Sequence, residues 1–322
     1  MSLVFGIFLL TLMLITAVAV VRTRNLFVAT TLMGIFSLLL AANFFLLDAA
    51  DVALTEAAVG AGISTVLFLS ALSLTAEQEK TGQGSRLVAL IVVSVTTLAL
   101  LHASLETPRV GDINAPVHQH VAPWYIEKTP ELIDVPNIVT AVLASFRGYD
   151  TLGEVFVVFT AGIGVLFLLA HYPQKKPHRP HQGLRHYLIQ RLVGRTVIPF
   201  ILLFGFYVQF HGDFGPGGGF QAGALVAAAI ILYALLDGTD SAIQVIPGWF
   251  LKAMVAGGAL LYGGVGVAGM LLGGNFLDYS VLSSDPVAGQ HLGILLIELG
   301  VGITVTGVLL SIFFAFASRK HY

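Results

Sequence analysis

Long apolar segments alternate with shorter polar ones along most of the chain. A helix that crosses a lipid bilayer needs about 20 mostly apolar residues, and nine segments meet this requirement. They cover residues 2–21, 26–46, 52–74, 86–105, 151–171, 189–210, 219–236, 249–272 and 291–316. The pattern predicts an all-α integral membrane protein with nine transmembrane helices. Because the connections at 47–51 and 75–85 are short, we expect the first four helices to be neighbours.

Two polar, proline-containing segments interrupt the apolar pattern. Residues 106–150 contain five prolines, and residues 172–188 are basic and contain three. These breaks divide the chain into parts. We predict a four-span module at 1–105, an outer loop plus a fifth span at 106–171, a basic cytoplasmic linker at 172–188 and a second four-span module at 189–322.

Basic residues lie mostly on one side of the nine predicted helices. If the N-terminus is outside, the inner segments hold twelve Lys and Arg residues and the outer segments hold three. The inner residues are Arg22, Arg24, Lys80, Arg86, Lys175, Lys176, Arg179, Arg185, Arg191, Arg195, Arg319 and Lys320, and the outer ones are Arg109, Lys128 and Arg147. Because cytoplasmic segments of membrane proteins are enriched in Lys and Arg, we predict an N-out/C-in topology in the cell membrane. Most acidic loop residues then face outward, where they would attract cations.

The composition is that of a chain surrounded by lipid. Only 11% of the residues are charged and 56% are hydrophobic, whereas a soluble domain has about 25% charged residues. The net charge of −2 favours no nucleic-acid partner, and the lack of cysteine excludes thiolate metal sites. The ten histidines lack the spacing of a zinc enzyme. We therefore expect no enzyme chemistry, no cofactor and no metal centre.

Three glutamates lie inside predicted helices, where a charge costs about 3 kcal/mol on insertion scales. The first is Glu56, whose neighbours are small residues that include Gly60 and Gly62, so another helix can approach closely. Glu56 is a candidate for a protonatable group on an ion path. The alternative is a carboxylate near the outer boundary of its helix that reaches water.

Glu154 belongs to a charged group at the start of the fifth predicted helix. Asp150 precedes it by four residues, so both lie on one helical face, and Arg147 is three residues before Asp150 and can pair with it. These three residues are candidates for the ion path, or for a surface cluster in which the acids stabilise the helix N-terminus. Glu298 lies deeper, about two turns into the last predicted helix. Glycines on both sides of Glu298 indicate close helix packing there.

The segment HGDFGPGGGF, residues 211–220, is the most unusual part of the sequence. A proline followed by three glycines does not form a stable helix in lipid. We predict a re-entrant turn at the outer surface, packed against protein, with a positive φ angle in at least one of the three consecutive glycines. The residues singled out in this turn are His211, Asp213, Pro216, Gly217, Gly218 and Gly219. The turn is either purely structural or holds an ion through Asp213 and backbone groups.

Three segments together resemble subunits of known ion-transporting complexes. LTEAAVGAGISTVLFL and FRGYDTLGEVFVVF are similar to the C-terminal, D/E-like part of the A subunit of Mrp-type multisubunit Na⁺/H⁺ antiporters. FHGDFGPGGGFQAGALVAAAIILYAL resembles the B subunit of the same complexes. The first two segments also resemble the D and E subunits of membrane-bound hydrogenase and the J-type subunit of complex I, and the third resembles the hydrogenase F subunit.

The resemblance implies a fusion of the A-type C-terminal part with the B subunit, joined at the basic linker. It implies functional roles for Glu56 in TEAAVG and Glu154 in DTLGE, and a place for Glu298 in the polar interior of the B-type part. We expect that the large proton-channel domain of an A subunit is not part of this protein. The resemblance therefore implies a secondary-transporter subunit that acts with antiporter-like A/D-type and K-like C-type subunits in lipid.

We expect a membrane subunit that lines or supports the path of Na⁺ and H⁺ in a multisubunit antiporter. Two alternatives remain open. The first is an ion-translocating membrane subunit of a membrane-bound hydrogenase or related respiratory oxidoreductase, whose catalytic subunits would be other chains. The second is a structural scaffold that joins antiporter-like subunits and lines no path.

Overall fold

Helices make up nearly all the regular structure in the computed structural model, which describes residues 2–80, 85–109, 111–170, 184 and 187–318. In these ranges, nine helical segments are long and apolar enough to cross a membrane, which confirms the predicted all-α membrane fold. The spanning elements are α1 (Ser2–Arg22), α2 (Leu26–Leu46), α3–η1–α4 (Ala50–Thr55, Glu56–Ser64 and Thr65–Leu72), α5 (Arg86–Glu106), α9 (Gly148–Ala170), α10 (Leu188–His211), α11 (Gly219–Asp237), α13 (Gly248–Leu271) and α14 (Pro286–Ala317). The shorter elements are α6 (Pro116–Gln119), α7 (Val121–Leu132), α8 (Ile138–Thr140), η2 (Ala141–Phe146), α12 (Thr239–Val245) and η3 (Tyr279–Leu282). Among all these elements, η1 and η2 are π-helices and η3 is a 3₁₀-helix.

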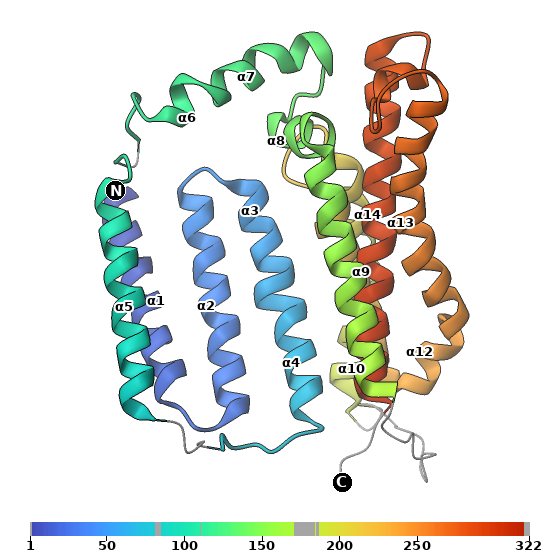
Figure 1. Ribbon diagram of the computed structural model, residues 1–322. Helices are drawn as coiled ribbons and strands as arrows, with labels where there is room; N and C mark the ends of the chain where they lie inside the picture. The colour runs from blue at the N-terminus through green and yellow to red at the C-terminus, as the bar shows by residue number, and fades with distance from the viewer. Residues whose placement is uncertain (1, 81–84, 110, 171–183, 185–186, 319–322) are drawn as a thin grey trace.

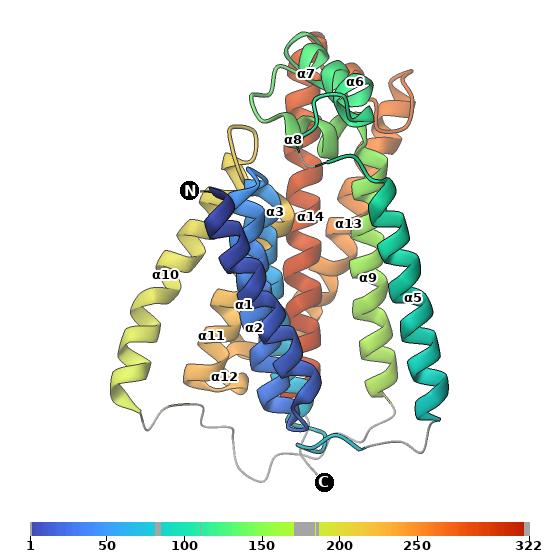
Figure 2. The ribbon, with the colours of Figure 1, turned by 90° about the vertical axis from the view of Figure 1, so that its left-hand side faces the viewer.

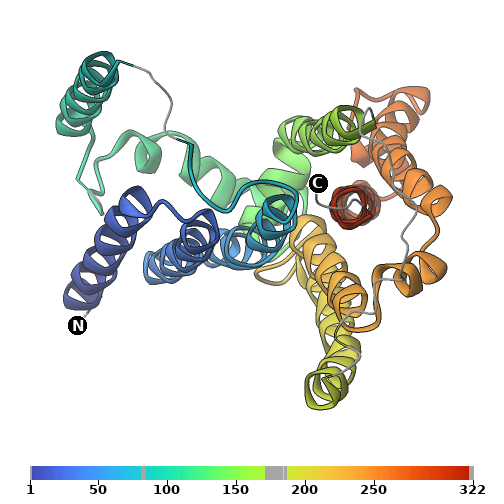
Figure 3. The ribbon, with the colours of Figure 1, turned by 90° about the horizontal axis from the view of Figure 1, so that it is seen from below.

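The C-terminal half is a helical bundle with α14 at its centre (Figure 3). α9, α11 and α13 pack around α14, and α10 packs on α11. Small residues make this packing possible. The backbone at Gly219, where α11 begins, lies against Gly302 of α14, and Gly258 of α13 lies against Gly300 of α14. A side chain at Gly219 or Gly258 would collide with the backbone of α14, so these helices approach each other closely.

An ion-pair network around a buried carboxylate joins α10 to the last residue of α11. Asp237 is 2% exposed, and its Oδ1 atom lies 2.7 Å from Nη2 of Arg191 and 2.6 Å from Nη2 of Arg195. A buried carboxylate is costly unless it is paired and hydrogen-bonded. The two arginines meet that requirement and hold α10 against α11 at the end remote from the glycine-rich turn.

The N-terminal helices α1, α2 and α3–η1–α4 form a row beside the bundle (Figure 1). α1 packs on α2, α2 packs on the α3–η1–α4 segment, and η1 packs on α11. Ile63 of η1 is buried in one hydrophobic cluster with Ala224 and Ala227 of α11 and Leu310 of α14. The N-terminal row is therefore attached to the bundle through a π-helical segment.

α5 stands apart from α1, α2 and α4, so the prediction that the first four helices are neighbours is wrong. All of its residues from Arg86 to Glu106 are exposed, and Figure 3 shows it separated from the other three helices. α5 is apolar along its length, and lipid solvates such a surface as well as a neighbouring helix does. A short connection therefore does not by itself make two membrane helices pack together.

α6 and α7 run across one end of the molecule and connect α5 to the bundle (Figure 1). After α7, the chain passes through the buried residues Ile133 and Val135 and returns through α8 and η2 to α9. α5 and α10 lie at opposite edges of the structure (Figure 2). The predicted linker at 172–188 lies mostly outside the described residues, so its position stays a prediction.

Candidate functional site

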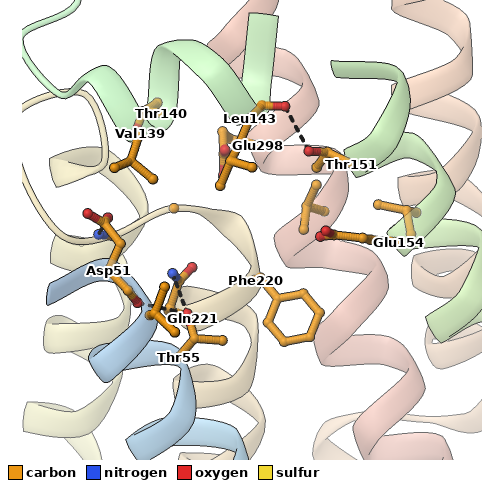
Figure 4. Close-up of a pocket in the computed structure, with 15 residues that line it drawn as sticks. Asp51, Thr55, Val139, Thr140, Leu143, Thr151, Glu154, Phe220, Gln221 and Glu298 are labelled. Atoms are coloured by element: carbon orange, nitrogen blue, oxygen red, sulfur yellow. Dashed lines mark hydrogen bonds between the residues drawn. The ribbon is translucent and has the colours of Figure 1, made fainter. Parts of the chain in front are cut away.

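A cavity of about 270 Å³ lies where the N-terminal row, the α8–η2–α9 segment and the glycine-rich turn meet (Figure 4). Its lining combines apolar side chains with acidic, hydroxyl and amide groups. The lining residues are Asp51, Val52, Thr55, Val139, Thr140, Leu143, Thr151, Glu154, Val155, Gly217, Gly218, Phe220, Gln221, Glu298 and Val301. These residues come from segments far apart in the sequence, so the cavity is a product of the tertiary fold.

Glu154 and Glu298 face this cavity from different helices (Figure 4). Glu154 lies near the start of α9, and it is exposed. Glu298 of α14 is partly buried, and its Oε2 atom accepts a hydrogen bond from the backbone N–H of Gly219, the first residue of α11. A helix N-terminus favours negative charge, so this contact stabilises an ionised Glu298. Both carboxylates therefore line one cavity, Glu154 from α9 and Glu298 from α14.

Neutral polar groups complete the lining. Nε2 of Gln221 donates a hydrogen bond to Oγ1 of Thr55 at 2.8 Å, which joins α11 to α3. The hydroxyl group of Thr151 donates to the carbonyl oxygen of Leu143 at 2.7 Å, which joins α9 to η2. Oε1 of Gln221 and the threonine oxygens retain lone pairs that can accept a hydrogen bond or contact a cation.

Two residues around α8 hold the glycine-rich turn between α10 and α11. Nδ2 of Asn137 donates to the carbonyl oxygens of Gly212 at 3.1 Å and Gly215 at 2.9 Å. The hydroxyl group of Thr140 donates to the same Gly212 oxygen at 2.6 Å. These contacts satisfy carbonyl groups that would be costly in a membrane without partners. The turn is therefore packed against protein, as predicted.

Gly217 and Gly218 bring this turn to the cavity. Gly218 has φ +122°, which confirms the prediction of a positive φ angle among the three glycines. A Cβ atom at this position would lie 3.0 Å from Oε2 of Glu298. The N–H of Gly217 donates to Oδ1 of Asp51 in α3 at 3.3 Å. The turn thus contacts one carboxylate of the N-terminal row and one carboxylate of α14.

The other side chains singled out in the turn do not line the cavity. The ring of His211 stacks on Tyr207, with ring centroids 4.7 Å apart, and Pro216 is exposed. Asp213 is partly buried, and burial raises the pKa of its carboxyl group, while the nearby His291 lowers it. These residues shape the turn and its surface, and the ion role considered for Asp213 stays a prediction.

Glu56 lies away from the cavity, on the side of η1 that faces α2. A Cβ atom at Gly60 would lie 2.5 Å from Oε1 of Glu56 and 2.8 Å from Oγ of Ser37 in α2. The missing side chain of Gly60 therefore makes room for the Glu56 carboxylate beside the serine. The structure brings Glu154 and Glu298 together and places Glu56 in a separate environment.

Arg147 and Asp150 form the ion pair that their spacing predicts. Nε of Arg147 lies 2.7 Å from Oδ2 of Asp150, and the side chains are 59% and 50% exposed. An exposed pair of this kind contributes little to stability. Asp150 also interacts electrostatically with Glu154, one turn further along α9. The pair lies beside the cavity and does not line it.

Sequence reasoning missed Asp51, Thr55 and Gln221 as site residues. Asp51 falls in the predicted connection at 47–51, whereas in the structure it lies in the first turn of α3. Gln221 carried a usable signal, because an amide in an apolar helix needs a hydrogen-bond partner. Thr55 carried no such signal, because the hydroxyl group of a threonine in a helix can donate a hydrogen bond to a backbone carbonyl of the same helix.

The arrangement is suited to binding protons and hard cations. It combines carboxylate, hydroxyl and amide oxygens in one cavity, and oxygen ligands are those that hard cations prefer. Among the described residues, no three His, Cys, Asp or Glu side chains come together as a metal-binding group. A cation here would therefore be held by a mixed set of charged and neutral oxygens.

Profiles of three families cover most of the chain. Residues 189–311 match a domain described as related to the MnhB subunit of Na⁺/H⁺ antiporter, whereas residues 11–77 match the MbhD family and residues 111–182 the MbhE family, both described as subunits of MBH. A protein of Staphylococcus haemolyticus named as a putative antiporter subunit, mnhB2, is 34% identical over 136 residues, which cover 41% of this chain and 96% of that protein. The chain belongs to the MnhB family of Na⁺/H⁺ antiporter subunits. This confirms the predicted resemblance to an antiporter membrane subunit.

Other relatives extend the likeness beyond the MnhB-type part. An uncharacterised protein of Methanocaldococcus jannaschii is 34% identical over 178 residues, which cover 50% of this chain and 66% of that protein. The Mrp complex from Dietzia sp. DQ12-45-1b contains a chain with a TM-score of 0.77 and 25% identity, and the match covers 96% of this chain and 34% of that one. The membrane-bound sulfane sulfur reductase, an archaeal respiratory membrane complex, contains a chain with a TM-score of 0.56 and 29% identity, and the match covers 72% of this chain and 97% of that one. This MnhB-family chain therefore has the fold of about one third of a longer Mrp chain.

Proposed function

We propose that the cavity between Glu154 and Glu298 is part of the ion path of a multisubunit cation/proton antiporter. One observation carries the proposal: two carboxylates from different membrane helices face the same cavity, together with hydroxyl and amide oxygens. A carboxylate within a membrane is costly unless it faces water, a partner or an ion path. A path that exchanges protons for cations accounts for both carboxylates.

The exchange follows from charge repulsion between the two glutamates. When both are ionised they repel each other, and binding of either a proton or a cation relieves that repulsion. Proton and cation therefore compete for the same negative charge, which is the basis of antiport. The proton-motive force can drive the exchange, since one elementary charge crossing 100 mV carries about 2.3 kcal/mol. The family description supports Na⁺ as the cation.

The chain performs this exchange within a larger assembly in the cell membrane, with its N-terminus outside and its C-terminus inside. The partners are antiporter-like A/D-type subunits and K-like C-type subunits. The match to only one third of a chain in the Mrp complex supports this assignment. The exposed apolar surface of α5 also supports a larger assembly, because it is available to another subunit as well as to lipid.

Replacement of the two glutamates tests the path. Glu154→Gln and Glu298→Gln keep size and hydrogen bonding but remove the titratable charge. Each should reduce Na⁺/H⁺ antiport in everted membrane vesicles at least tenfold, while the amount of assembled complex stays at the wild-type level. Glu154→Asp should retain partial activity because the charge persists.

Glu127→Gln is the matched control, because Glu127 is exposed on α7 and lies outside the predicted spans. It should transport at the wild-type rate. Wild-type transport by both cavity variants across the pH range would instead favour a structural scaffold.

A second candidate is an ion-translocating subunit of a respiratory complex. The match that covers 97% of a chain in the sulfane sulfur reductase complex favours it. Vesicles supplied with an artificial pH gradient and no electron donor separate the two functions. An antiporter should move Na⁺ under these conditions, whereas a redox-driven pump should require the donor.

A further inference from the structure

The joint between η2 and α9 is held by tyrosine hydroxyl groups from another part of the fold. Arg147 leaves helical geometry, with φ −125° and ψ 29°, before α9 begins at Gly148. Carbonyl groups at the end of a helix lack hydrogen-bond partners within it. At the end of η2, the hydroxyl of Tyr279 donates to the carbonyl oxygen of Ala144 at 3.0 Å. The hydroxyl of Tyr262 donates to the carbonyl oxygen of Gly148, the first residue of α9, at 2.7 Å.

Both tyrosines are fully buried. Tyr262 of α13 and Tyr279 of η3 are each 0% exposed, so these hydrogen bonds have no competition from bulk water. Burial raises the pKa of Tyr279, so its hydroxyl group stays protonated and able to donate. Gly148 leaves the space that the hydroxyl groups occupy: a Cβ atom there would lie 3.0 Å from Oη of Tyr279 and 3.7 Å from Oη of Tyr262.

The same joint determines where Glu154 lies. Thr151, in the first turn of α9, donates its hydroxyl hydrogen to the carbonyl oxygen of Leu143 in η2 and lines the cavity. Glu154 follows three residues later on the same continuous helix. Because a helix is stiff over this distance, the position and rotation of its first turn set the direction of the Glu154 side chain.

We propose that Tyr262 and Tyr279 are positioning residues that hold Glu154 opposite Glu298. The elements that carry the tyrosines, α13 and η3, both pack against α14, which carries Glu298. The hydrogen bonds of the two tyrosines therefore connect the start of α9 to α13 and η3, which pack against the helix that carries Glu298. This inference rests on the proposed function of the two glutamates. It assigns residues 189–311, the part that matches the MnhB-related domain, a role in positioning Glu154, which precedes that part in the chain.

The test removes single hydroxyl groups from the assembled complex. Tyr262→Phe and Tyr279→Phe keep the buried rings and delete the hydroxyl groups that donate to Gly148 and Ala144. Since one hydrogen bond contributes about 1 kcal/mol, we expect each variant to raise the half-saturating Na⁺ concentration for antiport about fivefold. The maximal rate per assembled complex should change little. Hydrogen exchange of the backbone amides of residues 148–154 should become faster in both.

One glycine substitution tests the same contact from the other side. Gly148→Ala places a Cβ atom against the Tyr279 hydroxyl group, and should also raise the half-saturating Na⁺ concentration. Its effect should not add to that of Tyr279→Phe, because both disturb one contact. Gly164→Ala is the matched control on the same helix, since a Cβ there meets nothing within 4 Å. Tyr207→Phe on α10 is the control for the hydroxyl deletion, because its side chain is exposed.

Wild-type Na⁺ affinity in both assembled phenylalanine variants would overturn the proposal. A lower yield of complex with unchanged affinity per complex would also overturn it, because the tyrosines would then be structural only. If Glu154→Gln and Glu298→Gln transport normally, the proposed function fails, and the tyrosine inference then depends on the amide exchange alone. The two failures are therefore distinguishable.

Discussion

At the residue scale, Thr55 and Glu56 are neighbours in the chain, at the junction of α3 and η1, but their side chains contact different helices. Thr55 faces α11 and accepts a hydrogen bond from Gln221, whereas Glu56 lies beside Ser37 of α2. Successive residues of a helix point about 100° apart, and of these two only Thr55 lines the cavity. We propose that Glu56 serves the ion path on the α2 side of this segment, apart from the Glu154–Glu298 cavity.

Gly60 provides a test of this separate site. Gly60→Ala introduces a Cβ atom 2.5 Å from the present position of Oε1 of Glu56, so the carboxylate must move. We expect antiport to fall severalfold in Gly60→Ala and to a similar or greater extent in Glu56→Gln, measured in vesicles with matched amounts of complex. Gly62→Ala lies in the same π-helix, and its Cβ would make only an ordinary contact, 3.5 Å from the carbonyl oxygen of Ala57. Equal losses in both alanine variants would mean that helix flexibility, and not the position of Glu56, is responsible.

At the scale of elements, the glycine-rich turn links the parts of the chain. It is held by Asn137 and Thr140, it contacts Asp51, and it precedes the helix whose first N–H binds Glu298. The π-helices η1 and η2 come from the two other segments that meet at the turn, and π-helical turns often occur at functional sites. The turn is therefore held in place by its own hydrogen bonds, and we propose that it positions Glu298 for the ion path.

Gly218→Ala separates these two roles. At φ +122° a Cβ atom costs about 1 kcal/mol or more, and here it would also lie 3.0 Å from Oε2 of Glu298. We expect both a lower yield of complex and a reduced rate of antiport per complex. Gly273→Ala is the control, because Gly273 has φ +94° but open space around its Cβ position. It should lower the yield alone. A loss of rate in Gly273→Ala equal to that in Gly218→Ala would contradict a direct effect on Glu298.

At the scale of the whole molecule, the orientation in the membrane is testable because the chain contains no cysteine. Single cysteines at Gln119 and Gln182 should react with a membrane-impermeant reagent from opposite sides. Gln119 lies in α6, and Gln182 lies outside the described residues. The twelve-to-three distribution of basic residues predicts that Gln119 is outside and Gln182 inside. Reaction of both from the same side would contradict the N-out/C-in topology.

The sequence by itself determined the elements that depend on local physics. Nine apolar segments of the length of a bilayer predicted nine spanning helices, and the described part of the chain confirms them. The spacing of Arg147 and Asp150 predicted their ion pair, and the run of three glycines predicted a positive φ angle. In each case the energy depends on residues that are neighbours in the chain or on the surrounding lipid, so no knowledge of distant contacts was required.

Only the tertiary structure decided which residues share a site. The cavity combines residues from Asp51 to Val301. The tyrosines that bond to the carbonyl groups around the start of α9 come from two further elements, α13 and η3. Apolar helices in lipid have no strong hydrophobic drive to pack in one particular way. Close contacts at small residues and individual hydrogen bonds select the arrangement instead. This is why the separation of α5 and the direction of Glu56 could not be derived from the sequence pattern, while the number and type of the elements could.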